Sequence, residues 1–169
     1  MGDLKGLRTY LIGPIEFIDN RGATEWRKKA SDIFKSMGVI VYDPTNKPNG
    51  ISSEIEEERR KITELKNQGN WKEFRKQMKE IVHGDLRAVD RADFLIAYMP
   101  NDVPMWGTVH EAVIARNQKK PVFVFTGNKK EKSNSWATYI IGENYIFETL
   151  DEIVEIIKNK SLKDFCPWS

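Results

Sequence analysis

The chain has 169 residues, a formal net charge of +2 and a single cysteine, Cys166. This length predicts one domain with a substantial core, and the near balance of charge argues against a nucleic-acid partner, which usually shows a concentrated basic face. One cysteine excludes an intramolecular disulfide and suits a reducing compartment. The start of the chain lacks the layout of a signal peptide, and no apolar run is long enough to span a membrane, so we expect a soluble cytoplasmic protein.

The first part of the chain alternates short apolar runs with an amphipathic one. Residues 7–12 predict a strand that ends in a sharp turn at residues 13–14, and residues 39–42 predict a second strand. Between them we expect a helix over residues 24–37, with Thr24 as its N-cap. Tyr10 in the first strand has two interpretations, since it either fills the sheet or reaches toward a ligand crevice.

A charged segment follows at residues 46–79 and is expected to form a helical insertion. It opens with a loop rich in proline, glycine and asparagine, after which Ser53 and Glu56 fit a capping box for a helix that ends near Asn67. The run of charges at residues 54–60 is typical of a solvated helix face. A lid and an oligomer contact are the alternatives for this run.

The helix that starts at Trp71 carries a carboxylate on its apolar stripe. Residues on this stripe recur at spacings of three and four, as on one face of a helix. They are Phe74, Met78, Ile81, Asp85, Ala88 and Ala92. An inward carboxylate is costly unless it is paired, hydrogen-bonded or next to a crevice. Asp85 is therefore a candidate functional residue, and the alternatives are a structural pair with His83 or Arg87, or a kink at Gly84 that turns it outward.

The next part of the chain has the order strand, turn, helix, strand. Apolar runs at residues 94–99 and 121–125 predict two strands, and residues 109–118 predict a helix between them. So short a crossover predicts a βαβ unit in a parallel sheet. Ligands of such sheets bind beyond the carboxyl ends of the strands, where the turn at residues 104–108 lies.

Glu111 is expected in the first turn of this helix, where a carboxylate faces the crevice and lies near the positive end of the helix dipole. Thr108 and Glu111 also fit a capping box, in which the glutamate only bonds the amide of the cap residue. The preceding loop has features that capping does not need. Gly107 permits a close approach of the backbone, and Trp106 offers a flat apolar surface.

The last part of the chain predicts an exposed lysine-rich loop at residues 126–135 and a short strand at residues 145–147. Thr149 and Glu152 predict the cap of a final amphipathic helix that docks on the sheet.

Taken together, three groups of residues resemble the nucleoside 2-deoxyribosyltransferase superfamily, which also holds nucleoside 5′-monophosphate N-glycosidases. They are Tyr10-Leu11-Ile12-Gly13-Pro14, Asp85 followed by Asp93, and Gly107-Thr108-x-x-Glu111 before Lys120-Pro121-Val122. The resemblance spans roughly residues 8–125, includes residues 147–157 more weakly, and leaves out the charged insertion. It implies a Rossmann-like (flavodoxin-like) α/β fold, with a parallel sheet of about five strands flanked by helices. Residues 1–169 are then a single domain with a helical insertion at about residues 46–79.

The resemblance also implies cleavage of an N-glycosidic bond by three side chains. Departure of a nucleobase builds positive charge on the sugar, which an adjacent carboxylate stabilises or attacks, as in retaining glycosidases. Glu111 is the expected nucleophile and forms a glycosyl-enzyme intermediate. Asp85 is expected to hold the sugar or to deliver a proton to the base. Tyr10 is expected to donate a hydrogen bond that orients Glu111.

Substrate contacts are expected from the turn after the first strand, from the loops around Glu111 and from a later polar stretch. The candidates are Gly13, Pro14, Ile15, Arg21, Asp102, Trp106, Gly107 and Asn134. Of these, Trp106 is expected to stack on the base and Asp102 to touch its polar edge. Asn134 belongs to the stretch at residues 133–136, which is either an exposed loop or a contribution to the site of a neighbouring subunit.

The expected function is transfer of a deoxyribosyl group from a (deoxy)nucleoside to another base, without a cofactor or metal, in a homo-oligomer. The partners are then a nucleoside or nucleotide and a free base. One alternative is a hydrolase that releases the base from a nucleoside or its 5′-monophosphate. Family members that cleave monophosphates carry a Gly-Ser loop and a second serine where this chain has Pro14 and Met105, although Arg21 and Arg27 supply charge nearby. The other alternative is a non-catalytic nucleotide-binding module.

Overall fold

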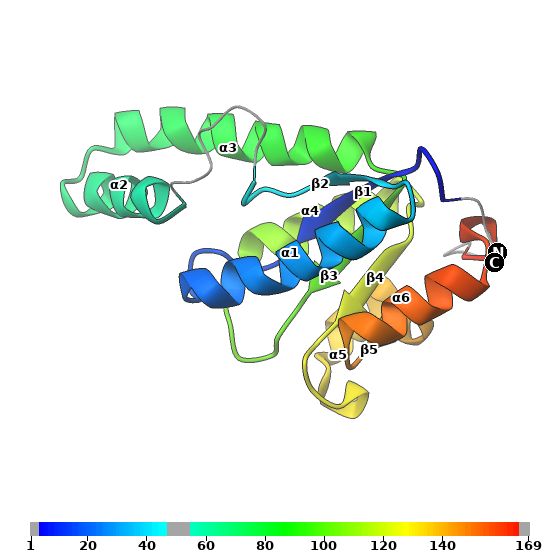
Figure 1. The fold of residues 1–169 in the computed structure, drawn as a ribbon. Helices are drawn as coiled ribbons and strands as arrows, with labels where there is room; N and C mark the ends of the chain where they lie inside the picture. Colours follow the sequence, from blue (N-terminus) through cyan, green and yellow to red (C-terminus); the bar gives the residue numbers. More distant parts are fainter. Residues whose placement is uncertain (1–3, 47–54, 166–169) are drawn as a thin grey trace.

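The computed structural model describes residues 4–46 and 55–165, and it consists of parallel strands alternating with helices (Figure 1). The strands are β1 (Arg8–Ile12), β2 (Ile40–Tyr42), β3 (Phe94–Tyr98), β4 (Val122–Phe125) and β5 (Ile146–Phe147). The α-helices are α1 (Asn20–Ser36), α2 (Ile55–Asn67), α3 (Trp71–Arg91), α4 (Trp106–Asn117), α5 (Ser135–Ile141) and α6 (Leu150–Asn159).

The strands form one five-stranded sheet in the order β2-β1-β3-β4-β5, and every neighbouring pair is parallel. Tyr10 of β1 lies opposite Leu95 of β3, and Ile96 of β3 lies opposite Phe123 of β4. The expected α/β fold is confirmed. This strand order is that of flavodoxin-like sheets, in which the chain reverses its direction of progress between β1 and β3 and leaves a ligand crevice at that point.

Helices cover both faces of the sheet, and alternation along β1 decides which residues face which helices. Leu11 packs in a core with Phe34 of α1 and Ile153 of α6. Its neighbour Tyr10 instead faces the opposite core, which contains Val89 of α3 and residues of α4 and α5. Tyr10 therefore starts on the side of the sheet where α3 and α4 lie.

Two helices begin earlier than the sequence predicts. The helix expected from Thr24 begins at Asn20, because the Asp19 side chain caps it by accepting a hydrogen bond from the Gly22 backbone amide. The helix expected from residue 109 begins at Trp106. The expected cap at Thr149 is confirmed, since its hydroxyl accepts from the Glu152 amide, and α6 docks on the sheet.

The segment expected as an exposed loop at residues 126–135 contains a 3₁₀ turn, Lys130–Lys132, and leads directly into α5, which the sequence analysis missed. The Asn134 side chain caps α5 by accepting hydrogen bonds from the backbone amides of Trp136 and Ala137, at 3.0 and 3.1 Å. The sequence signal for this helix is Asn134, a residue type that often caps helices. Only seven helical residues follow it, so the signal is short.

The charged segment folds as α2 and the first half of α3, which lie side by side and project past the end of the sheet (Figure 1). The expected cap at Ser53 lies outside the described residues. Two side chains join α2 to the loop between β1 and α1. Arg59 donates to the carbonyl oxygens of Glu16 and Ile18, at 2.9 and 2.6 Å, and Lys66 pairs with the Glu16 carboxylate at 2.9 Å. Within residues 55–60 of the charged run, Arg59 therefore makes a tertiary contact that a fully solvated face would lack.

Within the described ranges, none of the helices combines the length and the apolar character that a membrane crossing requires.

Candidate active site

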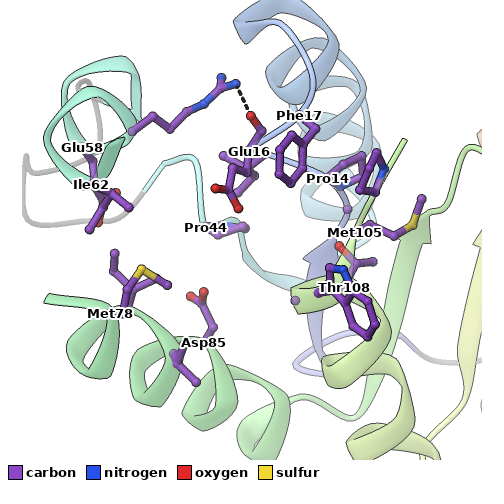
Figure 2. Close-up of a pocket in the computed structure, with 18 of the residues that line it drawn as sticks. Pro14, Glu16, Phe17, Pro44, Glu58, Ile62, Met78, Asp85, Met105 and Thr108 are labelled. Carbon is purple, nitrogen blue, oxygen red and sulfur yellow. Dashed lines mark hydrogen bonds between the residues drawn. The ribbon is translucent and has the colours of Figure 1, made fainter. Parts of the chain in front are cut away.

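A cavity of about 960 Å³ lies at the carboxyl end of β1, between α2, α3 and the start of α4 (Figure 2). Its wall is built from the end of β1 and the loop that follows it, from α2 and α3, and from residues 104–111 at the start of α4. This is the switch point of the sheet, where the strand order places a ligand crevice.

Glu111 is joined to Tyr10 across this cavity. The buried Tyr10 hydroxyl donates a hydrogen bond of 2.9 Å to Glu111 Oε1, which is the contact that we expected. The expected position of Glu111 within its helix is wrong, however. Because α4 begins at Trp106, Glu111 lies in the second turn, and Met105 is the N-cap residue without a side-chain cap bond. The capping-box interpretation of Thr108 and Glu111 is therefore also wrong.

Asp85 reaches the same cavity from α3. This helix continues through Gly84 without interruption, so the expected alternative of a kink is wrong. The Asp85 carboxylate points into the cavity (Figure 2). Three elements that are distant in the sequence, β1, α3 and α4, thus bring Tyr10, Asp85 and Glu111 to one cavity.

Burial dominates the electrostatics of the two catalytic candidates that touch each other. Loss of water, and then the negative charge of Asp85, raises the pKa of Glu111 to about 8, while the Tyr10 hydrogen bond and Arg27 oppose this shift. Burial also raises the pKa of Tyr10 well above its usual value, with Glu111 adding to the effect. Tyr10 therefore remains a hydrogen-bond donor at physiological pH.

Arg27 supplies a buried positive charge beneath the cavity. Its guanidinium donates to the carbonyl oxygens of Gly13, at 2.8 Å, and Ala23, and it lies over the Trp26 ring. Burial lowers its pKa to about 10, so the group is charged at neutral pH. A Cβ on Gly13 would lie 2.9 Å from the Trp26 ring and 3.2 Å from the Arg27 guanidinium, so only glycine permits this close packing.

The predicted substrate-binding residues separate into two groups. Five line the cavity, namely Gly13, Pro14, Ile15, Trp106 and Gly107. Trp106 is 86% exposed and is the first residue of α4, although the sequence analysis placed it on a loop.

The other three lie elsewhere. Arg21 is exposed on α1 and pairs with Glu25 at 2.7 Å, and Asp102 is exposed in the loop after β3. Asn134 caps α5 and lines a separate cavity of about 280 Å³. None of the three is therefore placed to touch a ligand beside Glu111 in this chain.

Comparison with known proteins decides the family. The family model described as nucleoside 2-deoxyribosyltransferase matches residues 9–156. The chain belongs to this family. The resemblance noted in the sequence is thereby confirmed, and the match covers the final segment, where the resemblance was weaker.

Two solved structures share the fold of this nucleoside 2-deoxyribosyltransferase family member. The first is a 2-deoxyribosyltransferase from the psychrotolerant bacterium Bacillus psychrosaccharolyticus, with a TM-score of 0.56 and 17% identity over 87% of this chain and 90% of the other. The second is the CMP N-glycosidase BcmB from Clostridium botulinum, with a TM-score of 0.50 and 14% identity over 90% of this chain and 98% of the other. No curated protein sequence matches the chain.

Family membership makes the chain an enzyme of the transferase or N-glycosidase kind. Among the residues that the structure describes, no three His, Cys, Asp or Glu side chains gather as a metal ion requires. Around Glu111, the cavity brings together the carboxylates of Glu111 and Asp85, the Tyr10 phenol and the Arg27 guanidinium.

Several cavity residues of this family member were missed as site residues in the sequence. Arg27 was named only as a nearby charge, although it lies on the buried stripe of α1 with Ala23, Ala30 and Phe34. Met78 and Ile81 share the α3 stripe with Asp85 and were predicted only as packing residues. Ile62 had no comparable signal, because its place at the cavity depends on how α2 docks.

We predict that Glu111→Gln stabilises the folded protein at alkaline pH. The folded-state pKa of Glu111 is about 8, above its ordinary value of 4.5, so the folded state loses stability as the pH rises from 4.5 through about 8. A glutamine keeps the acceptor for Tyr10 and cannot ionise. Urea unfolding should show a clear gain for the variant at pH 9 and a much smaller one at pH 5.

The matched control is Glu25→Gln, which removes an exposed carboxylate of an ion pair on α1. Exposed pairs contribute about 0–1 kcal/mol, so this variant should show a small effect at both pH values. If Glu111→Gln raised the free energy of unfolding by the same amount at pH 5 and pH 9, the result would contradict the buried environment assigned to Glu111.

Proposed function

We propose that this enzyme cleaves the N-glycosidic bond of a (deoxy)nucleoside with Glu111 as the nucleophile and transfers the deoxyribosyl group to another base. The observation that supports the proposal is the meeting of Glu111, Tyr10 and Asp85 at one cavity, with the Tyr10 hydroxyl 2.9 Å from Glu111 Oε1. A module that only binds nucleotides has no need for two carboxylates and a buried phenol in this arrangement.

In the first step, Glu111 Oε2 attacks the anomeric carbon of the sugar, and the bond to the base breaks with its electron pair going to the base nitrogen. Tyr10 donates to Oε1, which leaves Oε2 for the attack and fixes the carboxylate plane. Asp85 delivers a proton to the departing base, so that the base leaves as a neutral molecule. The product is a deoxyribosyl ester of Glu111.

In the second step, a nitrogen of the incoming base attacks the same carbon from the opposite face. The ester bond breaks, the Glu111 carboxylate is restored, and the proton of the incoming base passes to Asp85. Two inversions at the anomeric carbon give net retention, as in retaining glycosidases. If water takes the place of the base, the same steps release free sugar, and the enzyme is a hydrolase.

The electrostatics of the cavity set a condition for these roles, because the negative charge of Asp85 raises the pKa of Glu111 and the nucleophile must be ionised. A buried carboxylate is poorly solvated and therefore reactive, provided that it is ionised. The Tyr10 hydrogen bond and the Arg27 charge both favour the ionised form of Glu111. A proton held on Asp85 removes the repulsion between the two carboxylates, so an acid at Asp85 and a nucleophile at Glu111 support each other.

The walls of the cavity offer surfaces for a sugar and a base. Trp106 presents an exposed ring at the cavity, which suits stacking on a base. Arg21 is turned away and pairs with Glu25, so a 5′-phosphate contact through Arg21 has no support. The single domain, the homo-oligomer and the cytoplasmic location expected from the sequence stay predictions.

The activity is tested by incubating the protein with deoxynucleosides, ribonucleosides and their 5′-monophosphates, with and without a free acceptor base. Chromatography should show base exchange, which requires the acceptor. Release of free sugar at the same rate with and without acceptor supports the hydrolase instead. Glu111→Ala should lower kcat at least about a thousandfold, while Glu155→Ala, an exposed glutamate of α6, should leave it unchanged. Full activity of a folded Glu111→Ala protein would remove this residue from the mechanism.

A second prediction concerns Tyr10→Phe, which removes the hydrogen bond to the ionised form of Glu111. In the wild type, kcat/KM should rise with pH with a midpoint near pH 8, the pKa of Glu111, because it reports the ionisation of the free enzyme. In the variant the rising limb should move to higher pH, since the bond lowers the pKa of Glu111. A profile that keeps its midpoint in Tyr10→Phe would show that this contact does not tune the nucleophile.

A further inference from the structure

The cavity extends well beyond the two carboxylates. Its volume of about 960 Å³ lies at the upper end of the range of about 300–1,000 Å³ that is usual for ligand sites. The additional space lies between α2, α3 and the loop after β1. We call this space the apolar arm, because apolar side chains from these three elements line it. They are Phe17, Ile62, Met78, Ile81 and Val82.

The floor of the apolar arm continues the stripe of α3 on which Asp85 lies. Ile81 is four residues before Asp85 and Met78 is seven residues before it, so both share its face of the helix. At 1.5 Å per residue, Met78 lies about 10 Å along the helix axis from Asp85. A base that receives a proton from Asp85 therefore lies next to the apolar side chains of Met78 and Ile81 on α3.

The opposite wall comes from α2 and the loop after β1. Ile62 of α2 faces Met78 of α3 across the apolar arm (Figure 2). Phe17 is 57% exposed and borders the same space, so a large apolar ring faces water when the arm is empty. Covering such surface is favourable, and a ligand that does so gains affinity.

Two positive charges of α2 near the apolar arm have protein partners. Arg59 donates to the carbonyl oxygens of Glu16 and Ile18, and Lys66 pairs with the Glu16 carboxylate. These bonds hold α2 against the loop and so maintain the shape of the arm. α2 also contributes Glu58, Arg60, Thr63, Glu64 and Asn67 to the cavity lining, and the two glutamates disfavour a phosphate next to them.

We propose that the apolar arm binds an apolar alkyl or aryl substituent carried by the nucleobase, so that the substrates are nucleosides of substituted bases. The inference rests on the proposed function, because Asp85 locates the base only if it serves the leaving group. Each buried methylene group of a substituent adds affinity that an unsubstituted base lacks. The enzyme should therefore discriminate by the substituent as well as by the base.

The test is equilibrium binding of free bases to the wild-type protein, measured by isothermal titration calorimetry. N6-benzyladenine is compared with adenine, and N4-benzylcytosine with cytosine. In at least one pair, the substituted base should bind at least about tenfold more tightly. Equal or weaker binding of the substituted base in both pairs would overturn the inference. Binding needs no turnover, so this result does not depend on whether Glu111 is the nucleophile.

Variants of the arm localise the effect. Ile62→Asn on α2 and Met78→Asn on α3 should each lower the preference for the substituted base at least about fivefold, because a polar amide replaces apolar surface. The matched control is Leu65→Asn, which lies on α2 outside the cavity lining and should keep the preference. Circular dichroism checks that each variant is folded. A preference that survives both arm variants and is lost in Trp106→Ala would place the substituent at Trp106 and overturn the inference.

Discussion

The hydrogen bond between Tyr10 and Glu111 joins β1 to α4 at the point where the strand order of the sheet reverses. Because the side chains of β1 alternate between faces, Tyr10 reaches the side of the sheet on which α3 and α4 pack. The fold thus brings a phenol, the Glu111 carboxylate and the Asp85 carboxylate to one cavity, although they are far apart in the sequence. The proposed chemistry depends on this meeting.

The same arrangement sets an electrostatic balance that the protein must maintain when it folds. Burial and Asp85 disfavour the ionised form of Glu111, while Tyr10 and Arg27 favour it. Arg27 is itself buried and is held by the carbonyl oxygen of Gly13, in a turn that packs too tightly for any other residue. The pKa of Glu111 near 8 is the result of burial and Asp85, which raise it, and of Tyr10 and Arg27, which lower it. Each of these three side chains can be changed separately.

The sequence predicted the strands, the parallel βαβ unit and the inward carboxylate of α3, because these follow from local apolar periodicity. It placed the starts of α1 and α4 too late, since Asp19 caps α1 and α4 starts at Trp106 without any side-chain cap. It chose Arg21 as a binding residue and named Arg27 only as a nearby charge, whereas Arg27 lines the cavity. Two arginines on different faces of one helix cannot be ranked without knowing which face packs. The docking of α2 was not predictable either, since it depends on hydrogen bonds from Arg59 to backbone carbonyls of a distant loop.

The measurement that tests the central claim most directly is mass spectrometry of the protein quenched with acid during turnover of a deoxynucleoside. The account predicts a peptide heavier by one deoxyribosyl group, with the added mass on Glu111. Under the same conditions Glu111→Gln should give no such peptide. Steady turnover with an unmodified Glu111 peptide, or with the sugar on Asp85, would contradict the account.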